Sequence, residues 1–163
     1  MPLGTGSFDE TGRPRLKFHL CGAVPSVPGL DVEGVVDTGF TGFIQIPIEL
    51  GFALKLQLES TSQVTLADGS TITQVTVLAK AKYEGLEVTG AVGLAGSPII
   101  LLGMDFLRQF HLSLIVAREH VILMPEDWVE QALDEQKKTQ PQPTVPAPVE
   151  TAMTTPIPPE AET

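Results

Sequence analysis

The sequence predicts an all-β domain, a small barrel or sandwich, followed by one helix and a tail that packs no core. Short alternating runs of Val, Ile, Leu and Thr fill the chain before Pro125. Turn residues separate these runs at close spacing, which is typical of many short strands. Apolar residues at helical spacing follow Pro125. From Thr139 onward the chain is rich in proline and contains no glycine, which favours an extended, disordered tail.

The first strands are indicated by the alternation of apolar and polar side chains. Residues 16–20 alternate with a period of two, as expected of a half-buried strand. Residues 30–36 alternate apolar and acidic side chains, then become continuously apolar where they run into Asp37. A further β-rich run covers residues 43–48, and residues 48–51 are expected to form one short helical turn.

Two hairpins are predicted in the middle of the chain, at Asp68-Gly69 and at Glu84-Gly85. An Asp-Gly pair between β-rich runs is a strong hairpin signal, because both turn residues must tolerate positive φ. The strands expected beside these two turns are 63–67, 70–78, 77–83 and 86–92.

The end of the domain is expected to contain a buried strand, 99–102, that stops at Gly103, and a short helix over 105–110. A closing hairpin of 112–116 and 120–124 follows. After this hairpin, a C-terminal helix is favoured, because acidic residues stand near the start of the segment and lysines near its end. The predicted parts are a flexible N-terminus (1–12), a β domain (13–125), a C-terminal helix (126–138) and a disordered Pro-rich tail (139–163).

The composition excludes several classes of partner. The chain has 163 residues and a formal net charge of −10, which argues against binding to nucleic acid or to an anionic membrane. Its one cysteine, Cys21, cannot form an intrachain disulfide. Residues 1–15 lack the basic and apolar regions of a signal peptide. We therefore expect a soluble cytoplasmic protein. No His, Cys, Asp and Glu spacing fits a metal site, and we expect no cofactor.

The triplet Asp37-Thr38-Gly39 is the motif that carries chemistry, although three residues alone are a weak signal. The sequence around the triplet makes this signal stronger. An apolar strand delivers Asp37, and Gly39 permits a tight turn directly after it. About sixty residues downstream, the apolar pair before Gly103 leads into the predicted short helix.

The order of these features resembles the retropepsin-like aspartic proteases, most closely their small prokaryotic single-domain members. The strings that carry the resemblance are Val36-Asp37-Thr38-Gly39-Phe40-Thr41-Gly42 and Leu102-Gly103-Met104-Asp105-Phe106-Leu107. The resemblance covers residues 13–124 and implies that the β domain is a small closed barrel, a retropepsin-like protease domain. It implies a peptide hydrolase that acts on extended peptides or proteins.

Paired carboxylates explain why such a site needs aspartate. Peptide hydrolysis without a metal needs a general base for water and a general acid for the carbonyl group. Two carboxylates a few ångströms apart can share one proton and divide these roles. The chain has one Asp-Thr-Gly and is too short for two lobes, so the second Asp37 must come from another copy in a homodimer.

The resemblance also implies roles for the surrounding residues. Thr38 is expected to hydrogen-bond across the two catalytic loops, and Gly39 to offer its N–H near the carboxylates. Asp68 and Gly69 are expected at the tip of a flap over the substrate. Leu102 and Gly103 are expected to form the loop beneath the site.

Phe40 departs from the resemblance, because most retroviral and pepsin-like enzymes have Ala or Ser at this position. A hydroxyl there can hydrogen-bond the carboxylate and favour its charged form, whereas Phe40 cannot. We therefore expect activity at mildly acidic to neutral pH rather than at strongly acidic pH. Phe40 also narrows the expected cleft.

Two other residue sets admit alternatives. Asp105 is interpreted as a helix N-cap rather than a second catalytic acid, and Asp68 as a turn residue rather than a ligand. The fold could also serve as a catalytically silent dimer that binds peptides or partners. Pro143 and Pro146 form a PxxP pattern, which could dock to an adaptor but is more simply part of a disordered tail.

Overall fold

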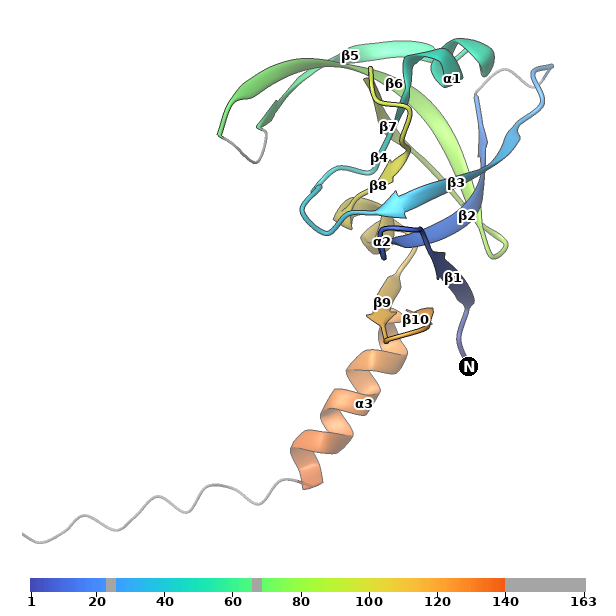
Figure 1. Cartoon of the computed structure of the whole chain (residues 1–163). Coiled ribbons are helices and arrows are strands. Elements are labelled where there is room, and N and C mark those ends of the chain that lie inside the picture. Colours follow the sequence, from blue (N-terminus) through green and yellow to red (C-terminus); the bar gives the residue numbers. More distant parts are fainter. Residues whose placement is uncertain (23–25, 66–68, 140–163) are drawn as a thin grey trace, which may run out of the picture.

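The computed structural model describes residues 1–22, 26–65 and 69–139 (Figure 1). The flap-tip residue Asp68 and the tail 140–163 lie outside the described residues. The helices in the described part are α1 (Ile48–Ala53), α2 (Met104–Gln109) and α3 (Glu126–Thr139). The strands in that part are β1 (Gly4–Phe8), β2 (Pro14–Cys21), β3 (Leu30–Val36), β4 (Ile44–Pro47), β5 (Gln57–Thr65), β6 (Thr71–Tyr83), β7 (Leu86–Ala95), β8 (Leu101–Leu102), β9 (Leu112–Val116) and β10 (Val121–Pro125).

A closed ring of six strands forms the body of the molecule. The hydrogen-bonded order includes β6-β7-β4-β8-β3-β2, and β2 pairs again with β6 through His19–Lys82, Leu20–Ala81 and Cys21–Lys80. Closure removes the exposed sheet edges that an open sheet would leave. The prediction of a small closed barrel is thus confirmed, and the sandwich is excluded.

The flap is the part of the β5–β6 hairpin that extends beyond this ring (Figure 1). Residues 71–78 of β6 pair with β5, residues 76–83 pair with β7 and residues 80–82 also pair with β2, so residues 71–75 pair with β5 alone. Gly69, beside the undescribed tip, has φ +83°, which glycine adopts without strain. The second predicted hairpin is also present, with Glu84 and Gly85 both at positive φ.

Aromatic side chains fill the barrel around α2. Phe106 and Phe110 are fully buried, with ring centroids 4.7 Å apart. Phe106 also packs against Phe18 and Phe43, each at 5.7 Å. Burying each such ring stabilises the fold by about 1.5–3 kcal/mol. Because α2 begins directly after Gly103, this core fixes the position of the loop that precedes it.

The N-terminus differs from the sequence prediction. Residues 4–8, which lie in the segment predicted to be flexible, form the strand β1, which pairs with β10 and with β2. Its glycines are needed for close packing: a Cβ on Gly4 would lie 2.0 Å from the Tyr83 hydroxyl, and one on Gly6 would lie 2.3 Å from the Arg15 carbonyl. These two glycines therefore permit the close contacts of β1 with its neighbours.

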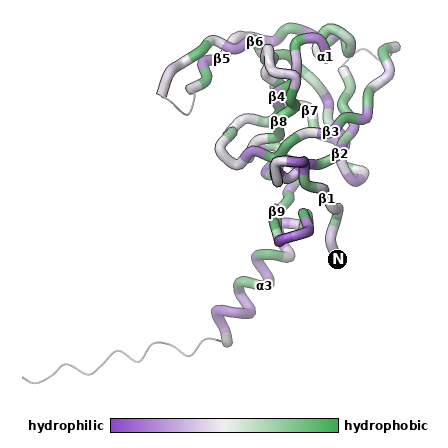
Figure 2. Tube along the Cα trace, viewed as in Figure 1, coloured by the Kyte–Doolittle hydropathy of each residue, from purple (hydrophilic) through white to green (hydrophobic). Residues whose placement is uncertain are grey.

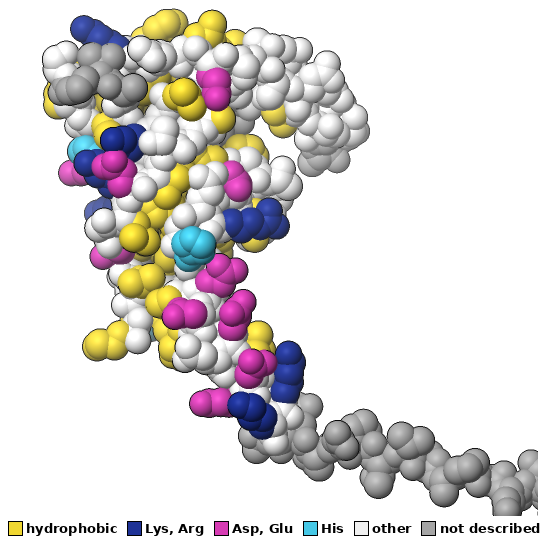
Figure 3. All heavy atoms as spheres, turned by 180° about the vertical axis from the view of Figure 1, so that it is seen from behind, with side chains coloured by type: hydrophobic (Ala, Val, Ile, Leu, Met, Phe, Trp, Pro, Cys, Tyr) yellow, Lys and Arg dark blue, Asp and Glu magenta, His cyan; other side chains and the backbone are white. Residues whose placement is uncertain are grey.

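The C-terminal helix α3 leaves the barrel beside β9 and β10 (Figure 1). Figure 2 shows that hydrophobic residues concentrate in the barrel strands, whereas α3 is mainly hydrophilic. Acidic side chains gather where this helix departs (Figure 3). Trp128 and Leu133 on α3 are about half exposed, at 45% and 51%. In the part of the chain that the structure describes, none of the helices has the length and hydropathy to cross a membrane.

Tyr83 generates a prediction about alkaline stability. Its side chain is 5% exposed, and its hydroxyl has no hydrogen-bond partner among the described residues. Burial, aided by the Glu84 charge, raises the pKa of Tyr83 from 10.0 to about 12. A raised pKa means that the fold favours the neutral phenol. The stability that the buried neutral phenol contributes is therefore intact below about pH 10 and is lost as the pH rises towards about 12.

We expect Tyr83→Phe to abolish this loss and to be neutral or stabilising by up to about 1 kcal/mol at pH 7, since it removes an unpaired hydroxyl. Urea unfolding between neutral and alkaline pH measures the effect. Tyr83 is the one tyrosine of the chain, so tyrosinate absorbance follows this group alone. An identical pH dependence in wild type and variant would contradict the assignment.

Candidate active site

Asp37 stands at the end of β3, beside β8. The two strands are parallel, with Val35 opposite Leu101 and Val36 opposite Leu102. The Asp37 N–H continues this ladder by donating to the Leu102 carbonyl at 2.9 Å. Since Val35 and Val36 are buried, the strand anchors the aspartate from within the barrel. The predicted delivery of Asp37 by an apolar strand is therefore present.

The Asp37 carboxylate is partly exposed and is supported by the turn that follows it. The Gly39 N–H donates to Asp37 Oδ1 at 2.9 Å, and the Phe40 N–H donates to the Asp37 carbonyl at 3.1 Å. Thr38 and Gly39 are exposed, so this loop lies open at the surface of the single chain.

Three backbone hydrogen bonds join the loop after Asp37 to the start of α2, and we call them the Gly103 clamp. The N–H groups of residues 103, 104 and 105 donate to the carbonyls of residues 43, 40 and 42, at 3.1, 2.8 and 3.3 Å. A Cβ at Gly103 would lie 2.1 Å from the Gly42 carbonyl oxygen and 2.6 Å from that of Phe40. Only glycine fits this approach.

The half-buried Phe40 ring packs on the same loop. Its ring atoms would lie 2.5 Å from a Cβ on Gly42 and 2.8 Å from one on Gly103. The aromatic ring therefore covers the backbone of the clamp, which a small residue would leave open. Phe40, the residue that departs from the resemblance, is thus packed against its own loop.

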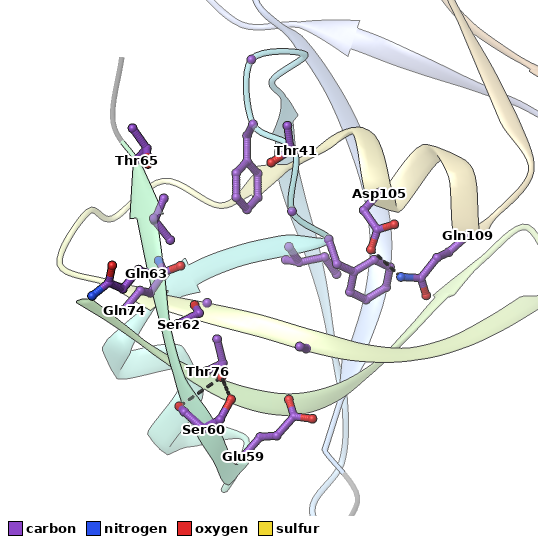
Figure 4. A pocket seen from close by; sticks show the side chains of 18 residues that line it. Thr41, Glu59, Ser60, Ser62, Gln63, Thr65, Gln74, Thr76, Asp105 and Gln109 are labelled. Carbon is purple, nitrogen blue, oxygen red and sulfur yellow. Dashed lines mark hydrogen bonds between the residues drawn. The ribbon is translucent and has the colours of Figure 1, made fainter. Parts of the chain in front are cut away.

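A groove of about 860 Å³ lies between this loop, the flap strands and α2 (Figure 4). It begins beside the loop that follows Asp37, at Gly39 and Phe40. On the flap side, the Thr76 hydroxyl donates to the Ser60 carbonyl at 3.0 Å and lies 2.8 Å from the Ser60 hydroxyl. Gln74 donates to the Gln45 side-chain carbonyl at 2.9 Å. The groove thus has one aromatic side and one polar side.

No model of a protein family matches the sequence, and no curated protein matches it. Among solved structures, the EIAV protease complexed with the inhibitor HBY-793 matches, with a TM-score of 0.50 and 15% sequence identity. The match covers 68% of this chain and 99% of the protease chain. The protein has a retropepsin-like fold. The identity is too low for the likeness to carry more than the fold.

The retropepsin-like fold brings most of the predicted site residues together. Asp37, Gly39 and Gly103 meet at the β3–β8 ladder and the clamp. Leu102 is fully buried beneath Asp37. Thr38 makes no hydrogen bond among the described residues of the single chain, and its predicted role concerns a second copy.

The interpretation of Asp105 as a helix N-cap is wrong. The N-cap of α2 is Gly103, without a side-chain hydrogen bond, and Asp105 lies inside the first turn. Its own N–H is used by the clamp, so the chain enters the helix earlier than predicted. Its carboxylate accepts a hydrogen bond from Gln109 at 2.6 Å and lines the groove (Figure 4).

Sequence reasoning also missed the polar residues of the groove. These groove-lining side chains from the flap and α2 are Glu59, Ser60, Ser62, Gln63, Thr65, Gln74, Thr76 and Gln109. Gln74 and Thr76 occupy strand positions that are less than 10% exposed, and the sequence alone does not show this burial. Polar residues at such positions must have partners or a function. Among the described residues, no cluster of His, Cys, Asp and Glu could hold a metal ion.

The clamp generates a prediction about stability. We expect Gly103→Ala to destabilise the protein by about 3 kcal/mol or more, because its Cβ would meet backbone oxygens that have no room to move. Urea denaturation measures the change. Gly96→Ala is the matched control, since its Cβ would meet nothing within 4 Å. Equal stability of the two variants would show that the loop can relax around the methyl group.

Proposed function

We propose that the protein is an aspartic endopeptidase that acts as a homodimer, with Asp37 of each chain forming a catalytic pair. The observation that carries this proposal is the placement of Asp37. Its carboxylate is accessible and receives the Gly39 N–H at 2.9 Å. Gly39 and Phe40, which follow it, line a groove large enough for a peptide segment. The retropepsin-like fold supports the proposal through its likeness to a protease structure.

The proposed reaction needs two carboxylates with different protonation. The ionised Asp37 of one chain takes a proton from a water molecule, whose oxygen attacks the peptide carbonyl carbon. The protonated Asp37 of the other chain donates its proton to the carbonyl oxygen. The Asp37 that was protonated by water then donates that proton to the peptide nitrogen, while the other Asp37 takes a proton from a hydroxyl group of the tetrahedral intermediate. The C–N bond breaks, the carboxylic acid and amine are released, and the pair again holds one shared proton. Neither a metal nor a covalent intermediate takes part in this scheme.

One chain supplies half of this machinery, because the sequence contains one Asp-Thr-Gly. The exposure of Thr38 and Gly39 supports the pairing of two such loops across a two-fold axis. In this proposal the Thr38 hydroxyl reaches the opposite loop. The flap, with Asp68 and Gly69 at its tip, closes over an extended peptide.

Replacing the catalytic carboxylate is the direct test of the mechanism. We expect Asp37→Asn to lower peptide cleavage by at least about 10³-fold, because the amide preserves shape but neither accepts nor shares the proton. Cleavage is measured on a mixed peptide library, with light scattering to follow the dimer. Asp31→Asn, on the exposed side of the same strand, is the control and should cleave normally. Undiminished cleavage by Asp37→Asn would overturn the mechanism.

Phe40 generates a prediction about pH. We expect the wild type to be most active at mildly acidic to neutral pH, and Phe40→Ser to shift the acidic limb of the pH profile lower. A serine hydroxyl can hydrogen-bond the carboxylate and favour its ionised form, whereas the aromatic ring cannot. The profile of kcat/KM measures the shift, and Phe40→Ala controls for loss of the ring. A wild-type optimum below about pH 3.5 would contradict the prediction.

A further inference from the structure

The charges along the groove all have one sign. Among the described residues that line it, Glu59 and Asp105 are acidic and none is Lys or Arg. They approach from different sides, Glu59 from the start of β5 and Asp105 from α2 (Figure 4). The groove therefore presents negative charge at two separate places.

The two strands of the flap, β5 and β6, add to this excess of negative charge. No lysine or arginine occurs between Lys55 and Lys80, while Glu59 and Asp68 lie in that stretch. The chain between these two lysines therefore contributes no positive charge to neutralise the groove. Arg108, next to the groove-lining Gln109, is exposed and does not line the groove.

The carboxylates of Asp105 and Glu59 can each still bind a cation. Asp105 Oδ2 accepts the hydrogen bond from Gln109, which leaves Oδ1 for another donor. Glu59 forms no ion pair with any residue in the described ranges, and its side chain is exposed. A carboxylate with a free oxygen forms charge-assisted hydrogen bonds with an ammonium or guanidinium group.

The polar flap side of the groove disfavours other substrates. Gln74 and Thr76 are buried and already paired with Gln45 and Ser60, so the surface they form is polar and firmly held. A purely apolar side chain would gain no hydrogen bond from this surface. An acidic side chain would meet two like charges. A long basic side chain can lay its methylenes along the groove and extend its charged end to a carboxylate.

We propose that the groove selects peptides that carry lysine or arginine beside the scissile bond, with Asp105 and Glu59 as specificity-determining residues. This inference rests on the proposed function. Because a two-fold axis would place one groove on each side of the paired Asp37 residues, the preference applies on both sides of the cleaved bond.

Matched peptides test the preference. A neutral parent peptide is made with lysine, norleucine or glutamate at each position flanking the cleaved bond, and kcat/KM is measured for the full-length protein. We expect the lysine peptide to exceed the glutamate peptide by at least about tenfold at one or more positions, a difference of about 1.4 kcal/mol. The preference should weaken as salt is added.

Removing each carboxylate identifies the residues responsible. We expect Asp105→Asn to reduce the lysine-to-norleucine ratio by about tenfold and Glu59→Gln to reduce it less, because Glu59 is more exposed. Asp105→Asn keeps an oxygen that can accept from Gln109, and circular dichroism checks its fold. Should that variant fail to fold, Glu59→Gln and the salt dependence of the wild type still test whether the groove prefers lysine. Glu119→Gln, remote from the groove, is the control and should keep the wild-type ratio.

Peptide binding separates this inference from the proposed function. Fluorescence anisotropy measures binding of the labelled lysine, norleucine and glutamate peptides to the Asp37→Asn protein. Stronger binding of the lysine peptide, without cleavage of any peptide by wild type, would sink the protease proposal and leave the groove assignment standing. Cleavage that shows no lysine preference, and no response of the ratio to Asp105→Asn or Glu59→Gln, would overturn the groove assignment alone.

Discussion

The close approach of two backbone segments at Gly103 is the constraint on which the rest of the structure depends. The oxygens of Phe40 and Gly42 lie where a Cβ would stand, so the segment after β8 can pass beneath the Asp37 loop only without a side chain. The hydrogen bonds of the clamp each contribute about 1 kcal/mol, less than the steric cost of a misplaced methyl group. Sterics therefore set the position of the loop, and hydrogen bonds hold it there.

This approach couples the core to the site. α2 begins directly after Gly103, carries the fully buried Phe106 and ends at the fully buried Phe110. The same backbone segment donates to the loop that follows Asp37. A shift of the helix would therefore move the carboxylate and one wall of the groove together. Rigid support of this kind is what the proposed role of Asp37 needs, because small misplacements of a catalytic group reduce catalysis strongly.

The sequence predicted the features whose signals are local and missed those that depend on distant partners. The strand into Asp37 and the turn at Glu84-Gly85 follow from alternation and turn chemistry. β1 was missed because Gly4 and Gly6 have weak strand propensity, and their pairing depends on β10, more than a hundred residues away. The polar groove was missed for a related reason: burial of Gln74 results from packing against Gln45 and Leu94, which no local pattern shows.

The proposed dimer and the proposed substrate preference depend on each other. The groove opens beside Gly39, on a loop exposed in the single chain, so a peptide across the catalytic pair would contact both copies. A ligand that binds the dimer and not the separate chains stabilises the dimer by mass action. Each chain carries a formal charge of −10, and association brings two such chains together against their repulsion. A basic peptide between the two grooves offsets part of that repulsion, so substrate binding and assembly of the active site favour each other.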